Sequence, residues 1–147
     1  MKKLFYIFVI FFFKVNIAHS LIEVDITRGN LDPLPIAVSP LHVDPLSDGY
    51  QEIKTKELGE LISAVVEKNF RSTGLFNPLN KDAFVQKPDI AHLKPRFEDW
   101  SLITAQALVT GKLLLKDEKL KIEFRLWDVA ANKEMIALAF TTTPSNW

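Results

Sequence analysis

The feature that most constrains the fold of this chain is an apolar stripe that ends in a glycine and a proline. Six apolar residues recur at helical spacing over roughly 15 positions, which predicts one amphipathic helix with a single buried face: Leu58, Leu61, Ile62, Val65, Val66 and Phe70. Thr55 is its expected N-cap. Gly74 follows where a left-handed residue would close the helix, and Pro78 keeps Asn77 extended. The pattern predicts a long helix that leads directly into an extended segment.

Candidate strands lie on both sides of this helix. They are apolar in alternation or in short runs and are bounded by turn residues: Leu21–Thr27, Pro35–Val38, Ala105–Leu115, Leu120–Val129 and Met135–Thr142. The third of these is the most apolar, so we expect it at the centre of the sheet. Lys116–Lys119 is typical of a charged hairpin connection. Asn80–Val85, capped by Asn80, and Phe97–Ile103 are predicted as short helical turns, and Lys87–Arg96 as a surface linker.

This order of elements predicts a mixed α/β (α+β) fold in one small domain. We expect a roughly five-stranded mixed sheet packed by one long helix and one or two short helices. The apolar run Ala107–Val109 and the aromatic residues Trp127 and Phe140 indicate that the second face of the sheet is also covered. For the same reason we expect Trp100 in the core. Asp128, at a strand end, is predicted to cap a turn.

The N-terminus has the pattern of a secretory signal peptide over residues 1–20. Lys2 and Lys3 precede the apolar run Leu4–Phe13, which is too short to span a membrane. Ala18 and Ser20 then place small residues at the −3 and −1 positions of a cleavage site, so we predict cleavage between Ser20 and Leu21. The second predicted unit is a mature domain over residues 21–147, and a secreted chain without cysteine is compatible with the periplasm.

An uncleaved membrane anchor is the alternative, because apolar residues resume after Lys14. Cleavage would remove three of the 18 basic residues and none of the 18 acidic ones, leaving 15 against 18 and a net charge of −3. No basic patch then points to nucleic acid. The chain has no cysteine, which excludes disulfides, thiolate metal sites and thiol catalysis.

Other chemistry is weakly supported. Ser39, His42, Asp44, Ser47 and Asp48 could be drawn as a hydrolase triad, but no nucleophile-elbow glycines accompany them. We therefore keep a small hydrolase only as a minor alternative. The histidines at 42 and 92 have no partner at metal-ligand spacing, so we expect two surface histidines. The predictions are no catalytic residue, no metal, no cofactor and no small-molecule substrate.

Four ordered segments of the chain resemble one protein family, and a fifth continues the likeness. The first segment comprises two strands and their turn glycine, Ile22–Gly29 with Pro35–Val38, and the second is the helix end, Phe70–Leu79. The third is a tryptophan followed by an apolar strand, Trp100 with Ala105–Gly111, and the fourth is a strand that ends in Leu-Trp-Asp-Val, Leu120–Val129. The fifth is the final dipeptide, Asn146–Trp147. Together they resemble the N-terminal domain of TolB, the periplasmic component of the Tol–Pal cell-envelope system.

The resemblance implies a non-enzymatic interaction domain that supports outer-membrane integrity and cell division. In the family, the mature N-terminus engages TolA, an inner-membrane protein. The matching positions are the expected partner-binding residues, with residues 28–31 less certain: Leu21, Ile22, Glu23, Val24, Asp25, Ile26 and Thr27. A free, alternating segment of this kind can add as a strand to a partner's sheet edge; alternatively, it is only the first strand of its own sheet.

The family also has a closing helix and a six-bladed β-propeller that docks the lipoprotein Pal. This sequence matches only the domain before them, so Pal binding is not expected. The alternative function is a truncated or split remnant with no independent role, in which loss of the closing helix exposes an apolar sheet face.

Overall fold

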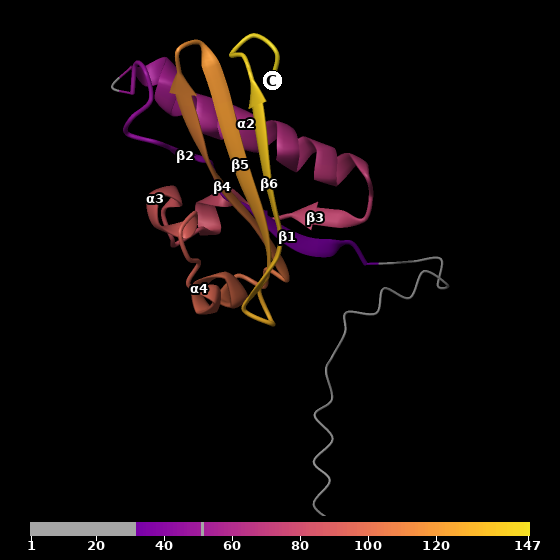
Figure 1. Ribbon diagram of the computed structural model, residues 1–147. Helices are drawn as coiled ribbons and strands as arrows, with labels where there is room; N and C mark the ends of the chain where they lie inside the picture. The colour runs from indigo at the N-terminus through magenta and orange to yellow at the C-terminus, as the bar shows by residue number, and fades with distance from the viewer. Residues whose placement is uncertain (1–31, 51) are drawn as a thin grey trace, which may run out of the picture. The chain divides into compact units, whose positions relative to one another are not determined.

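The long strands form one mixed sheet in the computed structural model, which describes residues 32–50 and 52–147. Its strand order is β3-β1-β4-β5-β6, and β2 also pairs with β4. The six strands are β1 (Leu34–Val38), β2 (His42–Val43), β3 (Phe76–Pro78), β4 (Ala107–Lys116), β5 (Lys119–Asp128) and β6 (Lys133–Thr142) (Figure 1). The predicted mixed α/β class is confirmed, with one strand more than the expected number.

Parallel and antiparallel pairs meet at β4. The strands β1 and β2 both run parallel to β4, and β3 runs parallel to β1. The strands β4, β5 and β6 form an antiparallel meander. The most apolar strand is therefore central, as predicted. The two-residue strand β2 was not predicted, because a pair that short carries no periodicity. The predicted strand Leu21–Thr27 lies outside the described residues.

The long helix α2 (Ile53–Ser72) covers one face of the sheet. Ile62 packs with Leu113 and Ile122, and Val66 and Phe70 pack over β1. We call this side of the sheet the α2 face. The predicted apolar stripe is thus the buried face of α2, except for Leu61 and Val65, which are about half exposed. These two side chains lie at the flank of the stripe, beyond the reach of the sheet.

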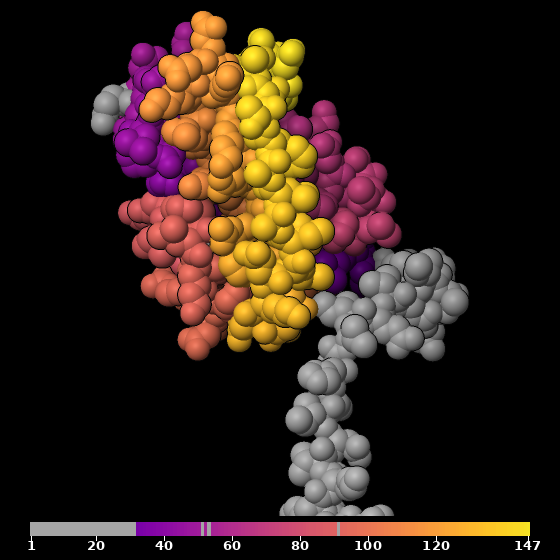
Figure 2. Space-filling view, viewed as in Figure 1, coloured from indigo at the N-terminus to yellow at the C-terminus, as the bar shows by residue number. Residues whose placement is uncertain are grey.

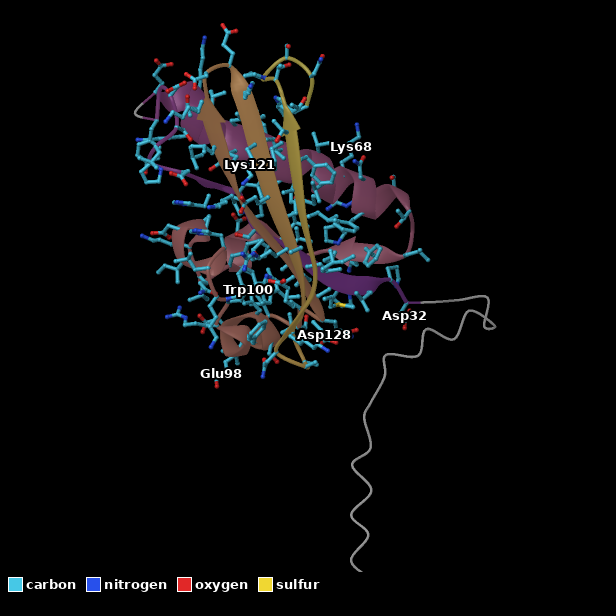
Figure 3. The ribbon with its side chains drawn as sticks, in the orientation of Figure 1. Asp32, Lys68, Glu98, Trp100, Lys121 and Asp128 are labelled. Carbon is cyan, nitrogen blue, oxygen red and sulfur yellow. The ribbon has the colours of Figure 1, made fainter. Side chains whose placement is uncertain are left out.

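Short helical segments cover part of the opposite face, which we call the α4 face. They are η1 (Lys81–Ala83), α3 (Pro88–Ala91) and α4 (Phe97–Leu102). Trp100 of α4 packs with Ala37, Leu108 and Trp127. Figure 3 shows Trp100 inside the domain and Glu98 of the same helix pointing outward. The expectation that both faces are covered is confirmed here, whereas the linker expected at Lys87–Arg96 contains α3.

The ends of α2 show which sequence signals were correct. Gly74 adopts φ +70° directly after the helix, as predicted for a left-handed stop. The start was wrong: Glu52 is the N-cap residue, without a side-chain cap hydrogen bond, and Thr55 is buried within the helix. Asn80 does cap η1, accepting a hydrogen bond from the backbone N–H of Asp82 at 3.0 Å. No helix in the described part of the chain is both long and apolar enough to cross a membrane.

Candidate interaction surfaces

The predicted partner-binding segment precedes β1 in the chain. Residues Leu21–Thr27 and the predicted cleavage position between Ser20 and Leu21 lie outside the described residues, so their roles stay predictions. The described chain begins at Asp32, which Figure 3 labels. Two residues later the N–H of Leu34 donates to the carbonyl oxygen of Leu75 at 2.9 Å. This bond holds the start of β1 against the segment that leads into β3.

The residues of the hydrolase alternative mostly stabilise turns. Asp44 Oδ1 accepts from the N–H of Leu46 at 2.9 Å, and Ser47 Oγ accepts from the N–H of Leu115 at 3.2 Å. Asp48 Oδ2 accepts from the N–H of Asp117 at 2.8 Å. Asp44 thus shapes the loop after β2, and Ser47 and Asp48 tie that loop to the β4–β5 end of the domain. These contacts explain why polar residues are dense there.

The two histidines stack on each other, which the sequence analysis missed. Their ring centroids lie 4.3 Å apart with an interplanar angle of 4°, joining β2 to the end of α3. His92 Nδ1 also lies 3.0 Å from the carbonyl oxygen of Pro88. The residues are 50 positions apart with no shared motif, so only the tertiary fold brings them together. No group of three or more metal-ligating side chains forms within the described ranges.

The electrostatic environment of His42 favours its neutral form. Burial lowers the pKa of His42 below its ordinary value of 6.5, and the adjacent His92 ring acts in the same direction. The carboxylates of Asp89 and Asp44 oppose this, while Lys112 adds to the lowering. The stack is therefore a packing contact in which the environment favours the neutral form of the His42 ring.

A large apolar surface lies on the α2 face of the last strand. Ile136, Leu138 and Phe140 of β6 are 48–52% exposed. Phe124 of β5 is half-buried beside them, with its ring 6.3 Å from that of Phe140. The prediction that Phe140 belongs to the core was wrong, because α2 does not extend over β6. Exposed apolar clusters of this kind mark interaction sites.

The α4 face of the same strands is charged. Glu123 of β5 forms ion pairs with Lys121 at 2.7 Å and Lys112 at 3.8 Å. The hydrogen bond from Lys121 lowers the pKa of the Glu123 carboxyl, and this effect outweighs the opposing effect of burial. Arg125 pairs with Glu134 at 3.4 Å. The strands β5 and β6 therefore have an apolar α2 face and a charged α4 face.

These features define a mixed α/β domain with an exposed apolar row and a charged row on its last two strands. The comparisons agree on its family. The TolB amino-terminal domain family matches residues 22–135. The chain is also 64% identical over 144 residues to the Tol-Pal system protein TolB of Pelagibacter ubique (strain HTCC1062), covering 97% of this chain and 32% of the relative. The chain therefore belongs to the TolB amino-terminal domain family and spans about a third of that relative.

Solved structures show the same fold at low sequence identity. TolB from Acinetobacter baumannii matches with a TM-score of 0.56 and 15% identity, over 78% of this chain and 24% of that chain. The LpoB C-terminal domain from Salmonella enterica matches with a TM-score of 0.53 and 7% identity, over 78% of this chain and 86% of that chain. At these identities the likeness concerns the fold alone.

Proposed function

We propose that this chain is a non-catalytic interaction domain of the Tol–Pal system. It acts in the periplasm and binds a TolA-like inner-membrane protein, in support of outer-membrane integrity and cell division. The observation that carries this proposal is the 64% identity to a Tol-Pal system protein TolB across nearly the whole chain. The open surfaces of the domain are consistent with a role in protein binding.

The binding element is the segment Leu21–Thr27. Ile22, Val24 and Ile26 alternate with Glu23 and Asp25, as in a strand that buries one side. Its backbone groups would pair with a free sheet edge of the partner, and the alternating side chains would give specificity. Pal is not an expected partner of this domain, because in the family the propeller docks it.

Leader removal is required to free that segment. We expect the secreted protein to begin at Leu21, so the mass of its N-terminal peptide should match a chain cleaved after Ser20. Retention of residues 1–20 on the purified protein would contradict the periplasmic proposal. It would favour the anchored form that the residues after Lys14 allow.

Partner binding is tested by calorimetry with the C-terminal domain of TolA from the same source. We expect the mature protein to bind and a deletion of Leu21–Thr27 to abolish binding, while the circular dichroism of the folded domain stays unchanged. A well-folded protein that does not bind would sink the TolA proposal. An unfolded protein would instead support the remnant alternative.

Two matched variants separate strand addition from charge attraction. Val24→Ser with Ile26→Ser removes apolar side chains from one side of the segment, and Glu23→Gln with Asp25→Asn removes charge from the other. We expect the serine variant to lose affinity at least about tenfold, because two of the three apolar side chains on that side are gone. The amide variant should lose less and lose its salt dependence.

A further inference from the structure

The outer edge of β6 is a long strand edge whose charged residues, Lys133 and Glu134, are confined to its first two positions. Among the described residues, β6 pairs only with β5. Figure 2 shows this strand, in yellow, on the surface of the domain beside β5. Met135–Thr142 contains neither a proline nor a charged residue, which are the usual devices that block edge pairing. A free edge of this composition is a template for another strand.

The side chains of β6 make that edge self-complementary on the α2 face. An evenly spaced apolar row on that face consists of Ile136, Leu138 and Phe140. These residues pair in register with Leu126, Phe124 and Ile122 of β5. In an antiparallel pair of β6 strands centred on Leu138, Ile136 of one copy faces Phe140 of the other and Leu138 faces itself. Ala137 faces Ala139 on the α4 face. Aromatic and β-branched cross-strand pairs are favourable contacts.

Charge complementarity fixes the same register on the α4 face. Arg125 is the β5 neighbour of Ala137, and Glu123 is the β5 neighbour of Ala139. In the paired arrangement, Arg125 and Ala137 of one copy lie in one row across the sheet with Ala139 and Glu123 of the second copy. Three strand spacings separate these Cα atoms by about 14 Å, and the two extended side chains reach across most of that gap. Symmetry provides this attraction twice.

We propose that the partner of this surface is a second copy of the chain, bound edge to edge through β6 in a two-fold symmetric dimer. The alanines are small enough to let the long charged side chains lie over them. The present ion-pair partners of Arg125 and Glu123 are exposed, so exchanging them costs little. The β6 edges close on each other, which leaves no further strand edge at that side and limits assembly to two copies.

Sedimentation equilibrium of the protein expressed with its own leader tests the dimer. We expect the mass to rise from one copy to two between about 1 and about 300 µM, without larger species. A monomer throughout that range would overturn the proposal, including the case in which residues 21–27 of the same chain cover the edge. Growth beyond two copies would also overturn it.

A lysine at the two-fold axis tests the edge. Leu138→Lys places like charges directly opposite each other, so we expect the dimer dissociation constant to rise at least about tenfold. The control is Leu61→Lys on α2, a similarly exposed leucine outside the pairing edge. Equal weakening by both variants would assign association to the general apolar surface and overturn edge pairing.

A charge exchange tests the register. Arg125→Glu and Glu123→Arg each place like charges across the two alanines, so each variant alone should dimerise at least about tenfold more weakly. Mixing the two restores both attractive rows, and we expect heterodimers to form. Mixing cannot rescue a variant that has failed to fold, so recovery identifies the contact. No recovery between two variants with native circular dichroism would overturn the proposed register.

Discussion

At the scale of single residues, Gln86 holds three segments of the α4 face together. Its side chain is 4% exposed. Its Oε1 accepts from Nε1 of Trp100 at 2.9 Å and from the N–H of Arg96 at 2.9 Å. Its Nε2 donates to the carbonyl oxygen of Lys94 at 3.4 Å. A buried amide with this many partners determines how the loop before α4 closes over the core.

Replacing this amide should be among the most destabilising single changes. Gln86→Leu leaves the Trp100 and Arg96 donors without a partner, so we expect a loss of about 2–4 kcal/mol in the free energy of unfolding. Urea denaturation followed by tryptophan fluorescence measures it. The control is Gln106→Leu at an exposed glutamine, with an expected change within about 0.5 kcal/mol. Equal losses in both variants would contradict the role of Gln86.

The β4–β5 turn contains a correctable strain. Asp117 and Glu118 have φ of +49° and +59°, a left-handed pair that matches a two-residue hairpin but suits glycine better. We expect Glu118→Gly to raise the unfolding free energy by about 0.5–1 kcal/mol. In contrast, Glu57→Gly within α2 should lower it by about 1 kcal/mol. Thermal denaturation of both variants checks the opposite signs, and a lower midpoint for Glu118→Gly would refute the argument.

At the scale of elements, α2 approaches the β2 segment through a glycine. A Cβ on Gly59 would clash with the carbonyl oxygen of Leu41, a backbone atom that cannot rotate away. Gly59→Ala should therefore cost about 1–3 kcal/mol from overpacking, although alanine is the better helix former. Asn69→Ala, at an exposed position of the same helix, is the control and should be neutral or slightly stabilising. Urea midpoints compare the two, and a stabilised Gly59→Ala would show that the helix can shift.

The contact between β2 and α3 depends on pH through the histidine stack. Because the pKa of His42 is lower in the folded state than its ordinary 6.5, the unfolded chain binds a proton first on acidification. The stabilising effect of neutral His42 is full above pH 6.5 and is lost as the pH falls through the folded pKa. The charged or titratable groups around the pair are Asp44, Lys56, Glu60, Lys87, Asp89, Lys112, Glu123 and Arg125.

We expect the urea midpoint to fall between about pH 7 and about pH 5, and His42→Gln to flatten this slope. The carboxyl of Glu123 has a lowered pKa, so its effect lies below 4.5 and outside this window. A His92→Gln variant serves as the comparison, because it removes the stacked ring but keeps the titrating imidazole of His42. An unchanged slope in His42→Gln would assign the pH dependence to other groups.

At the scale of the whole molecule, the strands of the sheet are covered to unequal extents. The central strands β4 and β5 have packed neighbours on both faces, whereas every residue of β6 except Thr142 is exposed. The hydrogen exchange of backbone amides should therefore be slowest in β4 and in the buried part of β5, and faster in β6. Mass spectrometry of exchange at low and high protein concentration measures this. Slowest exchange in β6 at low concentration would contradict the burial pattern.

The sequence predicted the elements whose signals are local. The apolar stripe of α2, the glycine stop at Gly74 and the three-stranded meander were all visible as periodicity or turn chemistry. The role of Asp128 was also correct, since its Oδ1 accepts from the N–H of Ala131 at 2.9 Å.

The arrangement of surfaces could not be predicted in the same way. The long strands of the meander, the glycine stop of α2 and family membership follow from neighbouring residues, and the sequence by itself determined them. Which aromatic residue is covered, which histidines touch and which strand edge stays open depend on contacts between distant segments. Phe140 has the same local pattern as a core residue, and only the limited reach of α2 across the sheet leaves it exposed. Tertiary packing decided the surfaces because burial is a property of the assembled layers.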